Sequence, residues 1–173
     1  MPRRRTVEQL VFRPDASEPV LEWMDCLTRA RDGWINLLPG VPETEVEETG
    51  GGVFSALFGT AQPPVSMCTW MPARTQESGT GEETVGIMHP KSGRAAPQLA
   101  AAGVAVPSSW RVRQDHVRRG LIAHPLPGAP HRETLSWMLR AGAALAMVPL
   151  TGSWQAAIYI PRAMGASDAD ARS

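Results

Sequence analysis

Histidine and acidic side chains gather in one stretch of the second half of the chain, and these residue types could carry acid–base chemistry. An imidazole exchanges its proton near neutral pH, and a nearby carboxylate can orient it. The candidate catalytic residues are His116, His124, His131 and Glu133. The alternative interpretation is that they are surface or capping residues, the commoner role of histidines at strand ends and in loops. The sequence therefore leaves enzymatic activity open.

The spacing of these residues argues against a resident metal or cofactor. The three histidines follow one another at intervals of eight and seven residues, which match no zinc-binding template. The one glycine run, Gly50 to Gly52, lacks the Gly-Lys-Ser/Thr that would complete a phosphate-binding loop. We expect neither a metal site nor a cofactor.

Arginines and one tryptophan form a second candidate site, this time for binding. A strand with alternating arginines can follow a phosphate backbone while an aromatic ring stacks on a base. The residues are Trp110, Arg111, Arg113, Arg118 and Arg119. Nucleic-acid binding is nevertheless only an alternative, because the sequence pI is about 6.9 and the chain has a single lysine.

Arg132 adds a further candidate binding residue at the start of a predicted helix. Together with His131 it places a basic pair where the helix dipole disfavours cations. Such a pair beside free backbone N–H groups could hold a phosphate or a carboxylate. Alternatively, Glu133 in the first turn offsets the two bases, or the helix begins later.

Charge is unevenly divided, although the 17 basic and 17 acidic residues cancel. The balance is −6 over residues 1–83 and +6 over residues 84–173, with a compact acidic run from Glu43 to Glu48. The two halves could steer an oppositely charged partner, or neutralise each other within the fold or across a dimer. Sixteen of the basic residues are arginines, a bias typical of a GC-rich genome, which we expect to be bacterial.

The cysteines and the apolar runs indicate a cytoplasmic protein without a membrane anchor. Cys26 and Cys68 have no paired spacing, and no apolar stretch follows the basic N-terminus, so we expect reduced, buried thiols. Cys68 alternates with Trp70 on a predicted strand face, which indicates packing. The most apolar run, residues 141–150, is half the length of about 20 residues that a membrane span needs.

Length and composition indicate one domain. A chain of 173 residues with 43% hydrophobic residues can form a core of its own, which excludes a disordered chain and a disulfide-dependent miniprotein. We expect a single globular domain over residues 1–162, followed by a flexible polar tail over residues 163–173.

The periodicity of apolar residues predicts the elements that position these candidates. Two strong helices are expected over 17–32 and 131–147, with a shorter helix from Ser92 to about Ala102. Residues 34–38 either continue the first helix loosely or begin an extended segment. The expected strands are 6–13, 65–71, 84–88, 110–117, 120–123 and 154–160. This mixture predicts an α+β fold, with an antiparallel sheet of about four to six strands packed by two or three helices.

The features together favour a non-enzymatic interaction module that binds a protein partner or forms a homo-oligomer. The acidic run 43–48, the arginine strand 110–119 and exposed tryptophans would carry the contacts, since tryptophan and arginine are enriched in binding hot spots. The alternatives are a small enzyme or ligand-binding protein that uses the histidines and acids of residues 115–133, and a nucleic-acid binder.

Overall fold

A computed structural model describes residues 7–43, 64–76 and 79–160 of the chain. Most of the acidic run, from Glu45 to Glu48, and the tail 163–173 lie outside the described residues.

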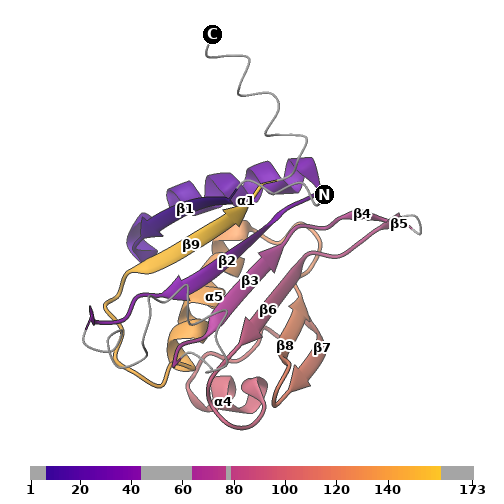
Figure 1. Cartoon of the computed structure of the whole chain (residues 1–173). Coiled ribbons are helices and arrows are strands. Elements are labelled where there is room, and N and C mark those ends of the chain that lie inside the picture. The colour runs from indigo at the N-terminus through magenta and orange to yellow at the C-terminus, as the bar shows by residue number, and fades with distance from the viewer. Residues whose placement is uncertain (1–6, 44–63, 77–78, 161–173) are drawn as a thin grey trace, which may run out of the picture.

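Seven strands form one antiparallel sheet, which confirms the predicted α+β class (Figure 1). In their spatial order the strands are β1 (Val7–Phe12), β9 (Trp154–Tyr159), β2 (Trp34–Pro39), β3 (Met67–Met71), β6 (Thr84–Met88), β8 (Gly120–His124) and β7 (Arg111–His116). The count exceeds the expected four to six because residues 34–38, which the sequence left open, form β2. The pairing of β2 with both β3 and β9 decides that conformation.

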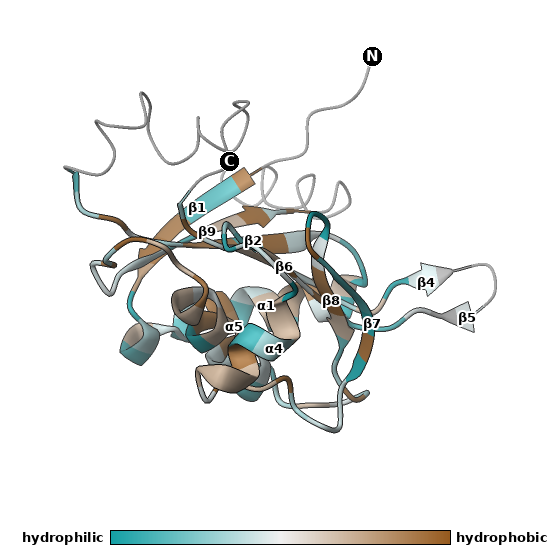
Figure 2. Ribbon diagram, turned by 90° about the horizontal axis from the view of Figure 1, so that it is seen from below, coloured by the Kyte–Doolittle hydropathy of each residue, from teal (hydrophilic) through white to brown (hydrophobic). Residues whose placement is uncertain are grey.

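Three helices lie on one face of the sheet, as Figure 2 shows. They are α1 (Glu18–Ala30), α4 (Ala95–Ala101) and α5 (His131–Ala144). A short 3₁₀ turn, η1 (Pro14–Ala16), precedes α1, and a small hairpin of β4 (Thr75–Gln76) and β5 (Gly79–Thr80) extends between β3 and β6. No helix in the described part of the chain is long and apolar enough to cross a membrane.

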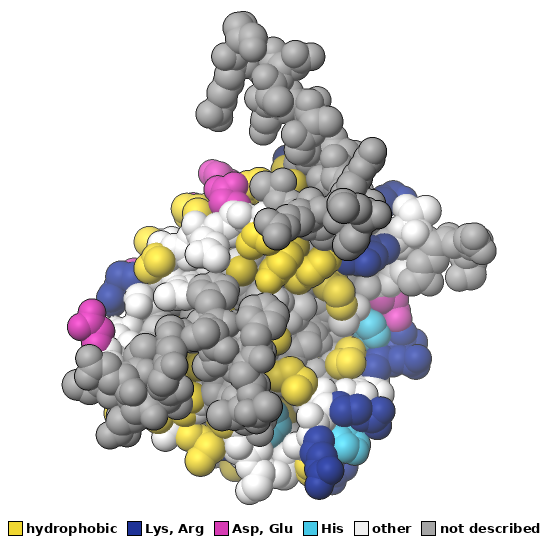
Figure 3. All heavy atoms as spheres, viewed as in Figure 1, with side chains coloured by type: hydrophobic (Ala, Val, Ile, Leu, Met, Phe, Trp, Pro, Cys, Tyr) yellow, Lys and Arg dark blue, Asp and Glu magenta, His cyan; other side chains and the backbone are white. Residues whose placement is uncertain are grey.

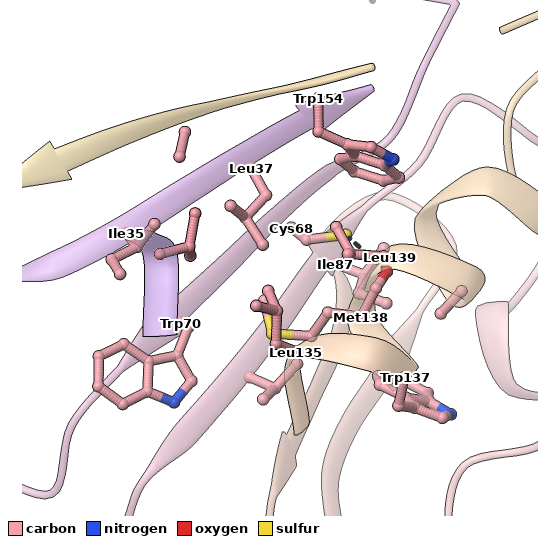
Figure 4. Close-up of a cluster of buried hydrophobic side chains, with 14 of the residues drawn as sticks. Ile35, Leu37, Cys68, Trp70, Ile87, Leu135, Trp137, Met138, Leu139 and Trp154 are labelled. Atoms are coloured by element: carbon pink, nitrogen blue, oxygen red, sulfur yellow. Dashed lines mark hydrogen bonds between the residues drawn. The ribbon is translucent and has the colours of Figure 1, made fainter. Parts of the chain in front are cut away.

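The core fills the space between the sheet and α5 (Figure 4). Because side chains alternate along a strand, Ile35, Trp70 and Ile87 point toward the helices and are 1% exposed. From α5, Leu135 and Met138 pack against them. Burying each such side chain contributes about 1.5–3 kcal/mol, so this layer holds α5 against the sheet with Leu135 and Met138 facing inward.

Candidate functional site

His131, the first residue of α5, bridges the two long helices. Its Nδ1 lies 2.7 Å from Oδ1 of Asp25, and its Nε2 lies 3.3 Å from Oγ1 of Thr28, one turn further along α1. The edge of its ring meets Trp70, with ring centroids 5.4 Å apart. The side chain is 16% exposed, whereas that of Asp25 is 62% exposed. Because both ring nitrogens already have partners, this histidine fits the role of a helix-to-helix bridge.

Glu83 lies close to His131 and is the most perturbed carboxyl of this region. The indole Nε1 of Trp70 donates a hydrogen bond to its Oε1 at 2.6 Å. Burial raises the pKa of Glu83, while the Trp70 hydrogen bond and the charge of His131 act in the opposite direction. A carboxyl with a raised pKa beside an imidazole is the kind of pair that acid–base chemistry needs.

His124, at the end of β8, contacts the segment that contains Glu83. Its Nδ1 lies 2.9 Å from the backbone oxygen of Glu83 and 3.3 Å from Oγ1 of Thr84. Its Nε2 is 3.9 Å from Oε2 of Glu82, which also pairs with Arg111. His124 thus contacts the residue pair Glu82–Glu83, and the charge of His131 acts on Glu83, so the structure brings these two candidate residues to one region.

The other two candidate catalytic residues have different surroundings. His116 accepts hydrogen bonds at Nδ1 from the backbone N–H groups of Arg118 and Arg119, so it shapes the turn after β7. It pairs with Gly120, whereas His124 pairs with Arg111, so the two histidines lie at opposite ends of the β7–β8 hairpin. Glu133 is exposed on α5. The four residues do not form one cluster.

The predicted arginine site lies on the β7–β8 hairpin, where basic side chains gather in Figure 3. The register between the two strands shifts between Val112 and Gln114, so the regular alternation expected for the arginines is interrupted. Trp110 is half-buried, and its ring meets Trp137 edge-on at 4.8 Å. The hairpin therefore offers exposed cations, the side chains of Arg111, Arg113, Arg118 and Arg119. Trp110 does not stand out as a free stacking surface.

The expectation of exposed tryptophans is wrong. Three of the six build the core, since Trp70, Trp137 and Trp154 are at most 3% exposed. The others, Trp23, Trp34 and Trp110, are half-buried. Trp34 stacks on Tyr159 of β9 with ring centroids 4.4 Å apart. The large rings mainly stabilise the fold.

A polar stripe on α5 separates two hollows on the surface. Arg132, Ser136 and Arg140 recur every four residues, are exposed, and line both hollows. The first hollow, of about 560 Å³, lies between α5, the start of α1 and the segment that leads into β9. The second, of about 420 Å³, is bounded by the Trp110–Trp137 pair. The sequence prediction named Arg132 as a binding residue but not Arg140, although helical periodicity places Ser136 and Arg140 on one polar stripe.

The structure shows why α5 tolerates a basic pair at its N-terminus. His131 contacts Asp25, and Arg132 donates a hydrogen bond to Oε1 of Glu18 at 2.6 Å. Both acids belong to α1. They offset the cations that the helix dipole disfavours, in addition to Glu133 in the first turn of α5.

The geometry thus offers a histidine–carboxylate region, an arginine-bearing hairpin and two hollows along α5. Within the described residues, no group of three or more His, Cys, Asp or Glu side chains could hold a metal ion. Comparison of the chain with protein-family models, with curated proteins and with solved structures finds no match, so its function has to be inferred from these residues and contacts.

Proposed function

We propose that this protein is a non-enzymatic interaction module that associates with a second copy of itself through the free edge of β1. Among the residues that the structure describes, β1 is the end strand of the sheet and pairs only with β9. The outer side of such a strand presents unpaired N–H and C=O groups that can pair with another strand. A second copy offers the same strand.

The difference between the two edges of the sheet carries this proposal. β7, the other end strand, has a register shift at Arg113 and exposed arginines, which are devices that discourage pairing with another chain. β1 has neither. Its six residues pair with β9 in unbroken register, Glu8 is its only charged residue, and Val11 is 75% exposed. A regular edge strand with exposed valines, which no other part of the described chain covers, favours association.

The sequence of β1 is also complementary to itself. When two copies run antiparallel about Gln9, the Val7 side chain of each lies opposite Val11 of the other, and the two Gln9 amides face each other. Val7, Gln9 and Val11 share one face because they alternate along the strand, and all three are exposed. Directly opposed β-branched or hydrogen-bonding pairs contribute about 0.2–1 kcal/mol each. The pairing would join two seven-stranded sheets into one.

Introducing a charge at Gln9 tests the proposal. Gln9→Lys or Gln9→Glu places two like charges directly opposite each other, which opposes pairing, and the exposed position leaves the fold intact. In analytical ultracentrifugation we expect a wild-type dimer, monomers of each variant alone, and a heterodimer when the two variants are mixed. Val112→Lys introduces the same charge at an exposed position of β7, the other end strand; it is the matched control and should still dimerise.

Two results would overturn self-association through β1. One is a wild-type protein that stays monomeric at high micromolar concentration. The other is a pair of Gln9 variants that still dimerise on their own. In either case the exposed arginines of the β7–β8 hairpin become the next surface to test, with single-stranded nucleic acid as the ligand.

A further inference from the structure

The first hollow has an apolar wall formed by three segments of the chain. Leu135 and Leu139 of α5 are nearly buried, and Trp154 at the start of β9 is 3% exposed. Ala143 and Leu150 extend this wall toward solvent. A volume of about 560 Å³ lies within the range of pockets that hold small molecules. The hollow can therefore remove a hydrocarbon chain from water.

The hollow also has cationic lining residues, from the same helix α5. The lining residues include Arg132 and Arg140 but no carboxylate. Arg132 is already paired with Glu18. Arg140 is exposed and, within residues 7–43, 64–76 and 79–160, makes no hydrogen bond or ion pair. Its guanidinium is thus available to a ligand, and Ser136 one turn away adds a hydroxyl.

We propose that this hollow binds a single-chain amphiphile with an anionic head, namely a medium-chain carboxylate. The chain lies against Leu135, Leu139 and Trp154, and the carboxylate pairs with the guanidinium of Arg140. A planar guanidinium matches a carboxylate with two parallel hydrogen bonds. The apolar wall selects for the hydrocarbon, and the unpaired cation selects for the charge.

The second hollow does not share these properties. It is smaller, and Glu133 lines it together with the same arginines. A carboxylate in the wall opposes the binding of an anion. The two hollows therefore differ in the ligand charge that they accept, and the first is the better match for an anion.

Calorimetric titration with decanoate, kept below its micelle concentration, tests the site. We expect binding of one decanoate per chain, and weaker binding of decanol, which has the same chain without the charge. Each buried methylene contributes about 0.8 kcal/mol, or about fourfold in affinity. Because the hollow is partly open, lengthening octanoate to decanoate should strengthen binding by up to about fifteenfold.

Two variants locate the ligand. Ala143→Phe fills the hollow from an exposed position and should abolish binding. Arg140→Ala removes the unpaired cation and should weaken decanoate about fivefold, as expected for an exposed charged pair, while decanol is unaffected. Arg118→Ala, an exposed arginine on the β7–β8 hairpin, is the matched control and should bind like the wild type. Thermal unfolding shows that each variant is folded.

Three outcomes would overturn the proposal: no decanoate binding to folded wild-type protein at millimolar concentration, undiminished binding to Ala143→Phe, or equal affinities for decanoate and decanol. The site does not involve β1, so these results are independent of whether the protein self-associates.

Discussion

Cys68 illustrates how a single buried residue sets a measurable property. It lies fully buried in β3, and its thiol points toward the backbone oxygen of Met138 at 3.6 Å (Figure 4). Burial raises the pKa of this thiol to about 12, because a thiolate cannot be solvated there. Alternation along the predicted strand had already indicated that Cys68 shares a core face with Trp70, and the structure confirms it.

The raised pKa predicts a loss of stability in alkaline solution. Above about pH 8.5 the thiol of the unfolded chain loses its proton, whereas the folded thiol keeps it until about pH 12. Deprotonation therefore favours the unfolded state, by about 1.4 kcal/mol per pH unit in this window. Between pH 8 and pH 10, urea denaturation should show the wild type losing about 2 kcal/mol more than Cys68→Ala. Equal losses in the two proteins would show that Cys68 does not cause the effect.

Other residue contacts could not be predicted from the sequence. Asp25 and His131 are 106 positions apart, and no local pattern indicates that they meet. The same holds for Glu18 and Arg132, which are 114 positions apart. The sequence identified two of these residues as chemically notable, but their roles depend on how α1 and α5 pack.

At the scale of elements, the packing of α5 depends on a residue that usually weakens helices. Gly142 lies in its last turns, where an added Cβ would come within 2.9 Å of both Sγ of Cys68 and the Trp154 ring. Both of these side chains are buried and have no room to move away. The glycine therefore lets the helix approach the sheet closely.

We expect Gly142→Ala to destabilise the protein by about 1–3 kcal/mol, as overpacking does. In an exposed helix the same change stabilises the protein by about 1 kcal/mol. The sign of the change in unfolding free energy therefore distinguishes a close contact at Gly142 from an open position. Chemical denaturation measures the effect, with Ser136→Ala on the outer face of α5 as a nearly neutral control. Adding Cys68→Ala to Gly142→Ala should restore part of the loss. A stabilised single variant would contradict the close contact.

The boundaries of helices and strands show which elements can be predicted from local sequence patterns alone. The long helices and β9 follow from their own periodicity, and the structure places them within a few residues of the prediction. Ser92 was expected to cap the shorter helix, but α4 begins at Ala95 and its N-cap residue is Arg94. The carboxylate of Asp115, from β7, accepts hydrogen bonds from the backbone N–H groups of Ala95 and Ala96 at 2.8 and 3.1 Å. A capping residue that comes from a distant strand cannot be recognised in the sequence around the helix.

At the scale of the whole molecule, the topology joins the two ends of the described chain. β9 lies between β1 and β2, and it pairs antiparallel with six residues of each. The first hollow depends on this arrangement, because its wall combines α5 with Pro14 and Trp154. Helical periodicity could mark the polar stripe on α5, but the hollow itself arises only when distant segments meet.

This topology predicts that a chain ending at Gly152, without β9, does not fold. Neighbouring strands lie about 4.8 Å apart, so loss of the strand between them leaves β1 and β2 about 10 Å apart, too far to pair. The core also loses Trp154, Ala156 and Ile158, which are all at most 3% exposed. We expect circular dichroism to show no cooperative thermal transition, whereas full-length Trp154→Phe retains a cooperative transition at a lower temperature. A cooperative transition in the truncated chain would show that the remaining strands form a stable sheet without β9.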